Sequence, residues 1–109
     1  MPQTGQPPGR VLIVGASRGS KVIDAARAVP AGGLLICLEG DRTAAAQAAA
    51  DFEREGLARQ ASVMIGDPAL FVRKVSGPFD LILVAPDWRG RLDAQLRAKL
   101  GAGGRILDL

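Results

Sequence analysis

The sequence predicts an α/β fold, namely a doubly wound, Rossmann-like and mostly parallel five-stranded sheet in the order 3-2-1-4-5, with helices on both faces. Two observations predict it. Five apolar, β-rich runs alternate along the chain with four segments of helical character. The apolar runs are continuous, which is typical of strands buried on both faces of a parallel sheet. Because crossovers between parallel strands are right-handed, a doubly wound sheet is the natural topology for this alternation.

The first half of the predicted domain has clear boundaries. Residues 10–109 are expected to form one domain after a disordered or loose lead-in over residues 1–9, which are rich in Pro, Gly and Gln. The run "RVLIV" predicts a buried first strand. From Ser20 the apolar residues have helical spacing, and "PAGG" at Pro30 ends that helix. The second strand is "LLICLE", which ends at Glu39.

The second half repeats the alternation. The alanine-rich "DRTAAAQAAADFEREGL" is the clearest helix, and Gly56 is placed to end it. A third strand, "ASVMIGD", precedes a short helix, "PALFVRKV", whose Pro68 takes the first position, where no backbone N–H is needed. A fourth strand, "FDLILVAP", follows. Leu92, Leu96 and Leu100 then share one face of a helix that "GAGG" ends before a last strand, "RILDL".

Composition excludes several classes of function. The 109 residues include no His, no Tyr and a single Cys, Cys37, which is expected to be a buried strand thiol. Ser-His-Asp and Cys-His relays, an internal disulfide and a zinc cage therefore cannot be built from this chain. The net charge is +3, but the 14 Lys and Arg residues are spread along the sequence. Aromatic residues, on which bases could stack, make up only 4%, so no specific nucleic-acid partner is expected. No signal peptide and no membrane span is recognisable, which favours a cytoplasmic protein.

The candidate site follows from the topology. In a doubly wound sheet the ligand lies beyond the carboxyl ends of the strands, where the winding reverses between strands 1 and 4. The residues that follow the strands are Gly15–Gly19, Glu39–Asp41, Gly66–Pro68, Ala85–Arg89 and Asp108. Glycines in "VGASRG" let the backbone approach a ligand, and Glu39 follows about 20 residues later, as a ribose-binding carboxylate does. The alternative for the glycines is that they only form a tight turn between a strand and a helix. The alternative for Glu39 is that it is a surface charge.

Two families share this opening. The stretch "VGASRG" resembles the short-chain dehydrogenases, but Lys21 follows Ser20 where a further glycine is usual. Those enzymes also act through a Tyr and Lys pair, and this chain has no Tyr. A working dehydrogenase of that family is therefore excluded, and only a bare NAD(P)-type dinucleotide-binding module stays open.

From Arg10 to Leu109 the chain resembles the core of a class I S-adenosylmethionine-dependent methyltransferase, closest to the small-molecule O-methyltransferase group and reduced relative to it. The motifs occur in order as "RVLIVGASRGSKVIDAARAVPAGG", "LLICLEGD", "VMIGDPALF", "GPFDLILVAPD" and "LRAKLGAGGRILDL". The resemblance implies that Glu39 binds the ribose hydroxyls of S-adenosylmethionine (SAM) or S-adenosylhomocysteine (SAH) and that Asp67 meets the adenine edge. The cofactor-binding residues that it implies are Gly15, Ala16, Ser17, Arg18, Gly19, Glu39, Gly40, Asp67, Pro68 and Ala85.

The chain departs from the family pattern at positions that carry chemistry. Ile13 stands where a carboxylate usually helps to hold the ammonium group of the cofactor, and Ser17 replaces the middle glycine of the turn. Ala85 replaces the metal-binding aspartate of the metal-dependent members. Asp87 and Asp108 alone cannot supply the converging oxygens that a divalent cation needs, so no catalytic metal is expected. Catalytic residues stay unassigned: Asp87 is the one candidate base, and the alternative is that it is a turn residue in "APDWRG".

Three functions stay open on these grounds. The first is a SAM-binding protein that methylates a small-molecule hydroxyl without a metal. The second is a noncatalytic methyltransferase-like relic that acts in assembly, and the third is the NAD(P)-type module.

Trp88, beside Arg89 and Arg91, could receive a planar anionic acceptor or cap the core or an interface.

A homodimer is expected from the end of the sheet. In the order 3-2-1-4-5 the last strand lies at an edge, where apolar residues such as Leu107 and unpaired backbone groups favour pairing with another chain. Twofold self-association is the commonest form of such pairing. The strand Arg105–Leu109 or the adjacent helix faces are the expected interface.

Overall fold

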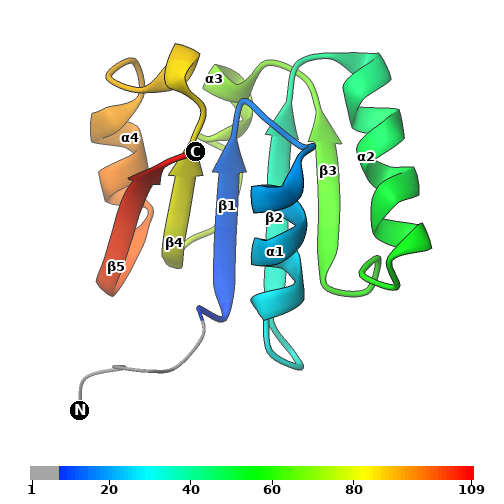
Figure 1. Cartoon of the computed structure of the whole chain (residues 1–109). Coiled ribbons are helices and arrows are strands. Elements are labelled where there is room, and N and C mark those ends of the chain that lie inside the picture. Colours follow the sequence, from blue (N-terminus) through cyan, green and yellow to red (C-terminus); the bar gives the residue numbers. More distant parts are fainter. Residues whose placement is uncertain (1–7) are drawn as a thin grey trace.

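The computed structural model describes residues 8–109, so most of the expected lead-in over residues 1–9 lies outside the described part. The strands are β1 (Arg10–Val14), β2 (Leu34–Glu39), β3 (Ala61–Ile65), β4 (Phe79–Val84) and β5 (Leu100–Asp108). The helices are α1 (Ser20–Ala28), α2 (Arg42–Arg54), α3 (Pro68–Phe71), the 3-10 helix η1 (Pro86–Trp88) and α4 (Asp93–Ala98). All strand pairs are parallel and their order is β3-β2-β1-β4-β5, which confirms the predicted topology (Figure 1).

β1 is the central strand and is buried on both faces. Val11, Leu12, Ile13 and Val14 are each 0% exposed. The strand pairs with β2 on one side and with β4 on the other. Because side chains alternate along a strand, Val11 and Ile13 face one layer of helices, and Leu12 and Val14 face the other. This double burial explains why the run is continuously apolar.

Helices cover both faces of the sheet, as predicted. On one face α1 and α2 enclose a core that includes Val22, Ala26 and Phe52, and α1 lies in front of the sheet in Figure 1. On the other face the segment after α3 contributes Val72, and α4 contributes Leu96. The two layers bury the apolar surface of the sheet, which is the main stabilising contribution in such a fold.

Local signals set the two ends of α2. The Asp41 side chain caps its start, because Oδ1 accepts a hydrogen bond from the Thr43 N–H at 3.0 Å. The helix ends before Gly56, whose φ is +74°. Glycine adopts this conformation without strain, whereas residues with a side chain rarely do. At 13 residues α2 is the longest helix of the described part, where none is long and apolar enough to cross a membrane.

Two helices are shorter than the periodicity of the sequence predicts. α3 covers Pro68–Phe71, although the helical pattern continues to Val75. After α3 the N–H groups of Arg73 and Lys74 donate to carbonyls three residues back, which tightens the chain into turns. α4 ends before Leu100, because that residue pairs with Phe79 in the sheet.

β5 is longer than expected, since the glycines of "GAGG" lie in the strand and not in a turn. Phe79 pairs with Leu100 and Leu81 pairs with Arg105, so two positions along β4 correspond to five along β5. The pairing register therefore shifts between these two points. A side chain on Gly104 would come 2.8 Å from the carbonyl oxygen of Phe79, which explains a glycine at this close approach.

The thiol of Cys37 gives a testable consequence of the packing. Cys37 is fully buried in β2, and burial, with a smaller contribution from the Glu39 charge, raises the pKa of its thiol to about 12. The thiolate is the reactive form, and at pH 8 the native thiol stays protonated. We expect iodoacetamide to leave the native protein unmodified by mass spectrometry, while the urea-unfolded protein is fully labelled. Labelling of the native protein at the rate of the unfolded one would contradict this packing.

Candidate functional site

Backbone hydrogen bonds hold the carboxyl ends of the strands together at one edge of the sheet. Each bond measures 2.9 Å, and they run from the N–H groups of Gly15, Gly66, Ala85 and Leu109 to the carbonyls of Leu38, Glu39, Val14 and Val84, respectively. Each bond joins the residue after one strand to the end of the next strand in the sheet. The segments that follow β1, β2, β3 and β4 therefore meet at one edge, as the topology predicts.

Both predicted glycines of the first turn have a backbone conformation that favours glycine, and Gly15 is also closely covered. Gly15 and Gly19 have φ values of +83° and +113°, which L side chains rarely adopt. Gly19 is open, because a side chain there would meet nothing within 4 Å. Gly15 is closely covered, since a side chain there would overlap Cδ1 of Trp88 and lie 2.7 Å from its Nε1.

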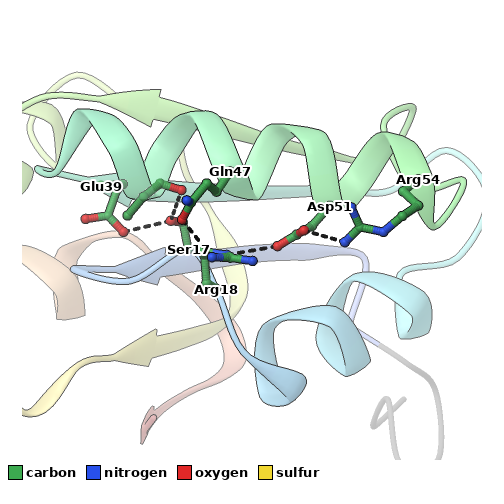
Figure 2. Close-up of polar contacts among 7 residues, drawn as sticks. Ser17, Arg18, Glu39, Gln47, Asp51 and Arg54 are labelled. Carbon is green, nitrogen blue, oxygen red and sulfur yellow. Dashed lines mark hydrogen bonds and ion pairs between the residues drawn. The ribbon is translucent and has the colours of Figure 1, made fainter.

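Ser17 and Glu39 form the buried polar pair of the site, with exposed fractions of 2% and 9%. The Ser17 hydroxyl donates to Glu39 Oε1 at 2.7 Å, as Figure 2 shows. The Asp41 N–H donates to Glu39 Oε2 at 3.1 Å. A carboxylate offers about four lone-pair positions, so Glu39 keeps capacity for further donors. Ser17, a departure from the glycine pattern, thus ties the first turn to the end of β2.

Arg18 extends away from the strand ends and along α2 (Figure 2). Its guanidinium donates to Gln47 Oε1 at 2.7 Å and to Asp51 Oδ2 at 2.9 Å, and Arg54 pairs with the other oxygen of Asp51. Hydrogen bonds from Arg54 and Arg18 lower the pKa of the Asp51 carboxyl below its ordinary value. The structure therefore does not bring the Arg18 guanidinium to the strand ends, and Arg18 fastens the first turn to α2 instead.

The predicted residues after β2 and β3 adjoin each other. A side chain on Gly40 would lie 3.6 Å from the carbonyl oxygen of Gly66, so these two turns are neighbours. Asp67 is exposed and caps α3, because its Oδ1 accepts from the Ala69 N–H at 2.9 Å. Pro68 is buried as the first residue of α3. The Asp67 carboxylate thus lies at the same edge as Glu39 but serves first as a helix cap.

The segment after β4 contributes one residue that was absent from the predicted cofactor-binding set. Ala16 and Ala85 are half-buried where expected, but the indole of Trp88 covers Gly15. The Arg91 guanidinium lies 4.2 Å from the centre of the Trp88 ring. Trp88 packs at the margin of the core, as a core cap does. Its position beside a turn with two arginines was visible in the sequence, but its contact with Gly15 was not.

The remaining departures have structural roles. Ile13, in place of the usual carboxylate, belongs to the core between the sheet and α1. Asp108 Oδ1 pairs with Arg89 Nε at 3.1 Å. Among residues 8–109, no three His, Cys, Asp or Glu side chains converge as metal ligands would. This end of the sheet thus offers a glycine turn that is open at Gly19 and a buried carboxylate, which together suit a ligand that carries vicinal hydroxyls.

A cavity of about 510 Å³ lies elsewhere. It is lined by Val29–Gly33, Arg59 and Gln60, which precede β2 and β3 at the opposite edge of the sheet. None of the predicted site residues borders it.

The Asp51 ion pairs predict how stability depends on pH. A carboxyl whose pKa is lowered on folding stabilises the protein above its unfolded pKa, and this contribution is lost as the pH falls through the lower folded pKa. We expect Asp51→Asn to lower the free energy of unfolding in urea at pH 7, and the deficit to shrink below the ordinary pKa of 3.8. Glu53→Gln, an exposed change on the same helix, is the matched control. Equal stability of Asp51→Asn and wild type at pH 7 would show that these ion pairs contribute nothing.

Comparison with known proteins agrees with this fold. No protein-family model matches the sequence. In an alignment of 82 residues that covers 71% of this chain, it is 38% identical to catechol O-methyltransferase from Niastella koreensis, of which the match covers 37%. The O-methyltransferase TomG from Streptomyces achromogenes, solved with SAM, matches 94% of this chain with 49% of its own, at a TM-score of 0.84 and 22% identity.

A second solved structure gives the same picture. The O-methyltransferase from Bacillus cereus, in complex with SAH, matches 88% of this chain with 46% of its own, at a TM-score of 0.80 and 22% identity. The chain thus spans about half the length of these solved structures and less of the curated relative. These matches confirm the resemblance seen in the sequence. The chain therefore has the core fold of the class I S-adenosylmethionine-dependent O-methyltransferases.

Proposed function

We propose that this domain binds SAM or SAH at the carboxyl ends of β1, β2 and β3, and that it serves O-methylation of a small molecule. The observation that carries the proposal is the buried Glu39 carboxylate. A hydrogen bond from Ser17 joins it to the glycine turn. This edge includes the point between β1 and β4 where the sheet reverses its winding and where doubly wound proteins bind ligands. Similarity to a catechol O-methyltransferase supports the proposal.

The residues present fit the cofactor at two points. Glu39 has lone pairs left to accept hydrogen bonds from the ribose hydroxyls, in addition to those from Ser17 and Asp41. At Gly19 a side chain would meet nothing within 4 Å, so a ligand can approach the backbone of the turn there. Asp67, which caps α3 just after β3, lies on the side proposed for adenine.

The proposed chemistry is transfer without a metal. SAM, when bound, supplies an activated methyl group, and the protein has mainly to align the acceptor oxygen with it. The Ala85 side chain offers no ligand to a cation at the end of β4. Asp87, which is exposed in η1, is the one proposed base at this edge.

Isothermal titration tests the cofactor assignment. We expect heat on binding of SAM and SAH, none with NAD, and the same affinity in EDTA. Glu39→Ala should weaken SAH binding by about 1–3 kcal/mol, because charge-assisted hydrogen bonds to the ribose are lost. Glu39→Gln keeps the size of the side chain and an acceptor for Ser17, so its affinity should be intermediate. Binding of NAD alone, a requirement for magnesium, or full affinity in folded Glu39→Ala would each contradict the assignment.

We also propose that the chain forms a homodimer through β5. β5 is the outermost strand of the sheet on one side, and Leu107 on it is 42% exposed. Figure 1 shows that, within residues 8–109, no helix covers β4 and β5 on the side where α1 lies. Pairing of two β5 strands would satisfy the edge backbone groups and cover Leu107.

Light scattering tests the dimer. The wild type is expected at twice the chain mass of 11.3 kDa at micromolar concentration. Leu107→Lys should give a monomer, because two buried ammonium groups cannot be accommodated at a twofold interface. Leu70→Lys is the matched control, since Leu70 is 56% exposed on α3, on the other face of the sheet. A monomeric wild type would remove the proposal, and a dimeric Leu107→Lys would place the interface elsewhere.

A further inference from the structure

The side chain of Trp88 lies where a ligand of this fold is expected. Ligands of doubly wound sheets occupy the crevice between the segments that follow the two strands at the winding reversal, here β1 and β4. Trp88 comes from η1, directly after β4, and its indole lies against Gly15, directly after β1. A side chain on Gly15 would overlap Cδ1 and lie 2.7 Å from Nε1 and 3.2 Å from Cγ of Trp88. The indole therefore leaves no space for a ligand group on this part of the turn.

The contacts that keep Trp88 there are local and lie near the surface. Its backbone N–H donates to the Ala85 carbonyl at 2.9 Å, and the Arg91 guanidinium covers the ring at 4.2 Å. Arg89 and Asp108 form an ion pair whose side chains are both exposed, and such pairs contribute little to stability. Trp88 itself is half-buried at the margin of the core. Movement of the indole away from Gly15 would therefore break the Arg91 contact and uncover only the margin of the core, where Trp88 packs.

We propose that Trp88 is a gate on the cofactor site, which closes the crevice over Gly15 in the free protein and moves outward when the ligand binds. This inference rests on the proposed function. A site that is open in only a fraction of the molecules has its apparent affinity reduced by that fraction. Removal of the indole should therefore strengthen binding. A stacking platform, the other role open to an aromatic residue here, predicts the opposite, because its removal would cost contacts with the ligand.

Fluorescence of Trp88 reports on the gate directly, because it is the single tryptophan of the chain. The indole lies against Gly15, and the Arg91 guanidinium covers its ring. We expect saturating SAH to increase quenching by acrylamide, as the indole moves into solvent. Decreased quenching would show that the ligand covers the indole, and unchanged quenching would show that the indole stays in place. Either result overturns the gate.

Affinity measurements give an independent test. We expect Trp88→Ala to bind SAH at least about threefold more tightly than wild type, with Trp88→Phe between the two. Arg91→Ala keeps the indole but removes the cation that covers it, so quenching of the free protein should rise and SAH affinity should increase slightly. Arg97→Ala, an exposed arginine on α4, is the matched control and should change neither.

The outcomes separate the gate from the proposed function. If wild type binds SAH and the folded Trp88 variants bind it equally or more weakly, the gate is wrong and the proposed function stands. If neither wild type nor the Trp88 variants bind SAH, both are wrong, since opening the crevice should at least permit binding. Circular dichroism identifies variants that fail to fold. If both Trp88 variants fail to fold, the quenching and SAH affinity of Arg91→Ala still test the gate.

Discussion

The complete burial of β1 is the constraint on which the rest of the structure depends. Its four apolar residues, Val11–Val14, pack against both helix layers while the backbone pairs with β2 and β4. A shift of register by one residue would exchange the two faces, so neither layer would then find its partner side chains. The position of β1 is thereby fixed, and Gly15 follows at the point where the sheet reverses its winding. The packing of the core therefore fixes the position of the first turn of the site.

A second, polar constraint is built on this one. Glu39 is a nearly buried carboxylate and needs hydrogen-bond donors, which Ser17 and the Asp41 N–H supply. Arg18 binds the same turn to α2 through Gln47 and Asp51 (Figure 2). Ser17 and Arg18 thus hold the first turn in place. A carboxylate oriented in this way before the ligand arrives loses less entropy on binding.

The strands could be predicted from the sequence more closely than the helices or the site contacts. β1 and β2 have the predicted bounds, because each is a continuous apolar run that ends at a turn. The helical spacing around Leu100 was misleading, since pairing with Phe79 draws this residue into the sheet. Topology alone also predicted which segments meet at the strand ends. It could not predict the direction of Arg18 or the contact of Trp88 with Gly15, because these depend on packing between residues far apart in the chain.

A crystal structure of this chain with SAH tests the central claim most directly. The account predicts that the ribose hydroxyls lie within hydrogen-bond distance of Glu39, in addition to its bonds from Ser17 and Asp41, and that the nucleoside lies at the carboxyl ends of β1, β2 and β3. Ligand density at any other place, such as the cavity beside Gly33 and Arg59, would contradict it. So would a bound nucleoside whose ribose makes no contact with Glu39.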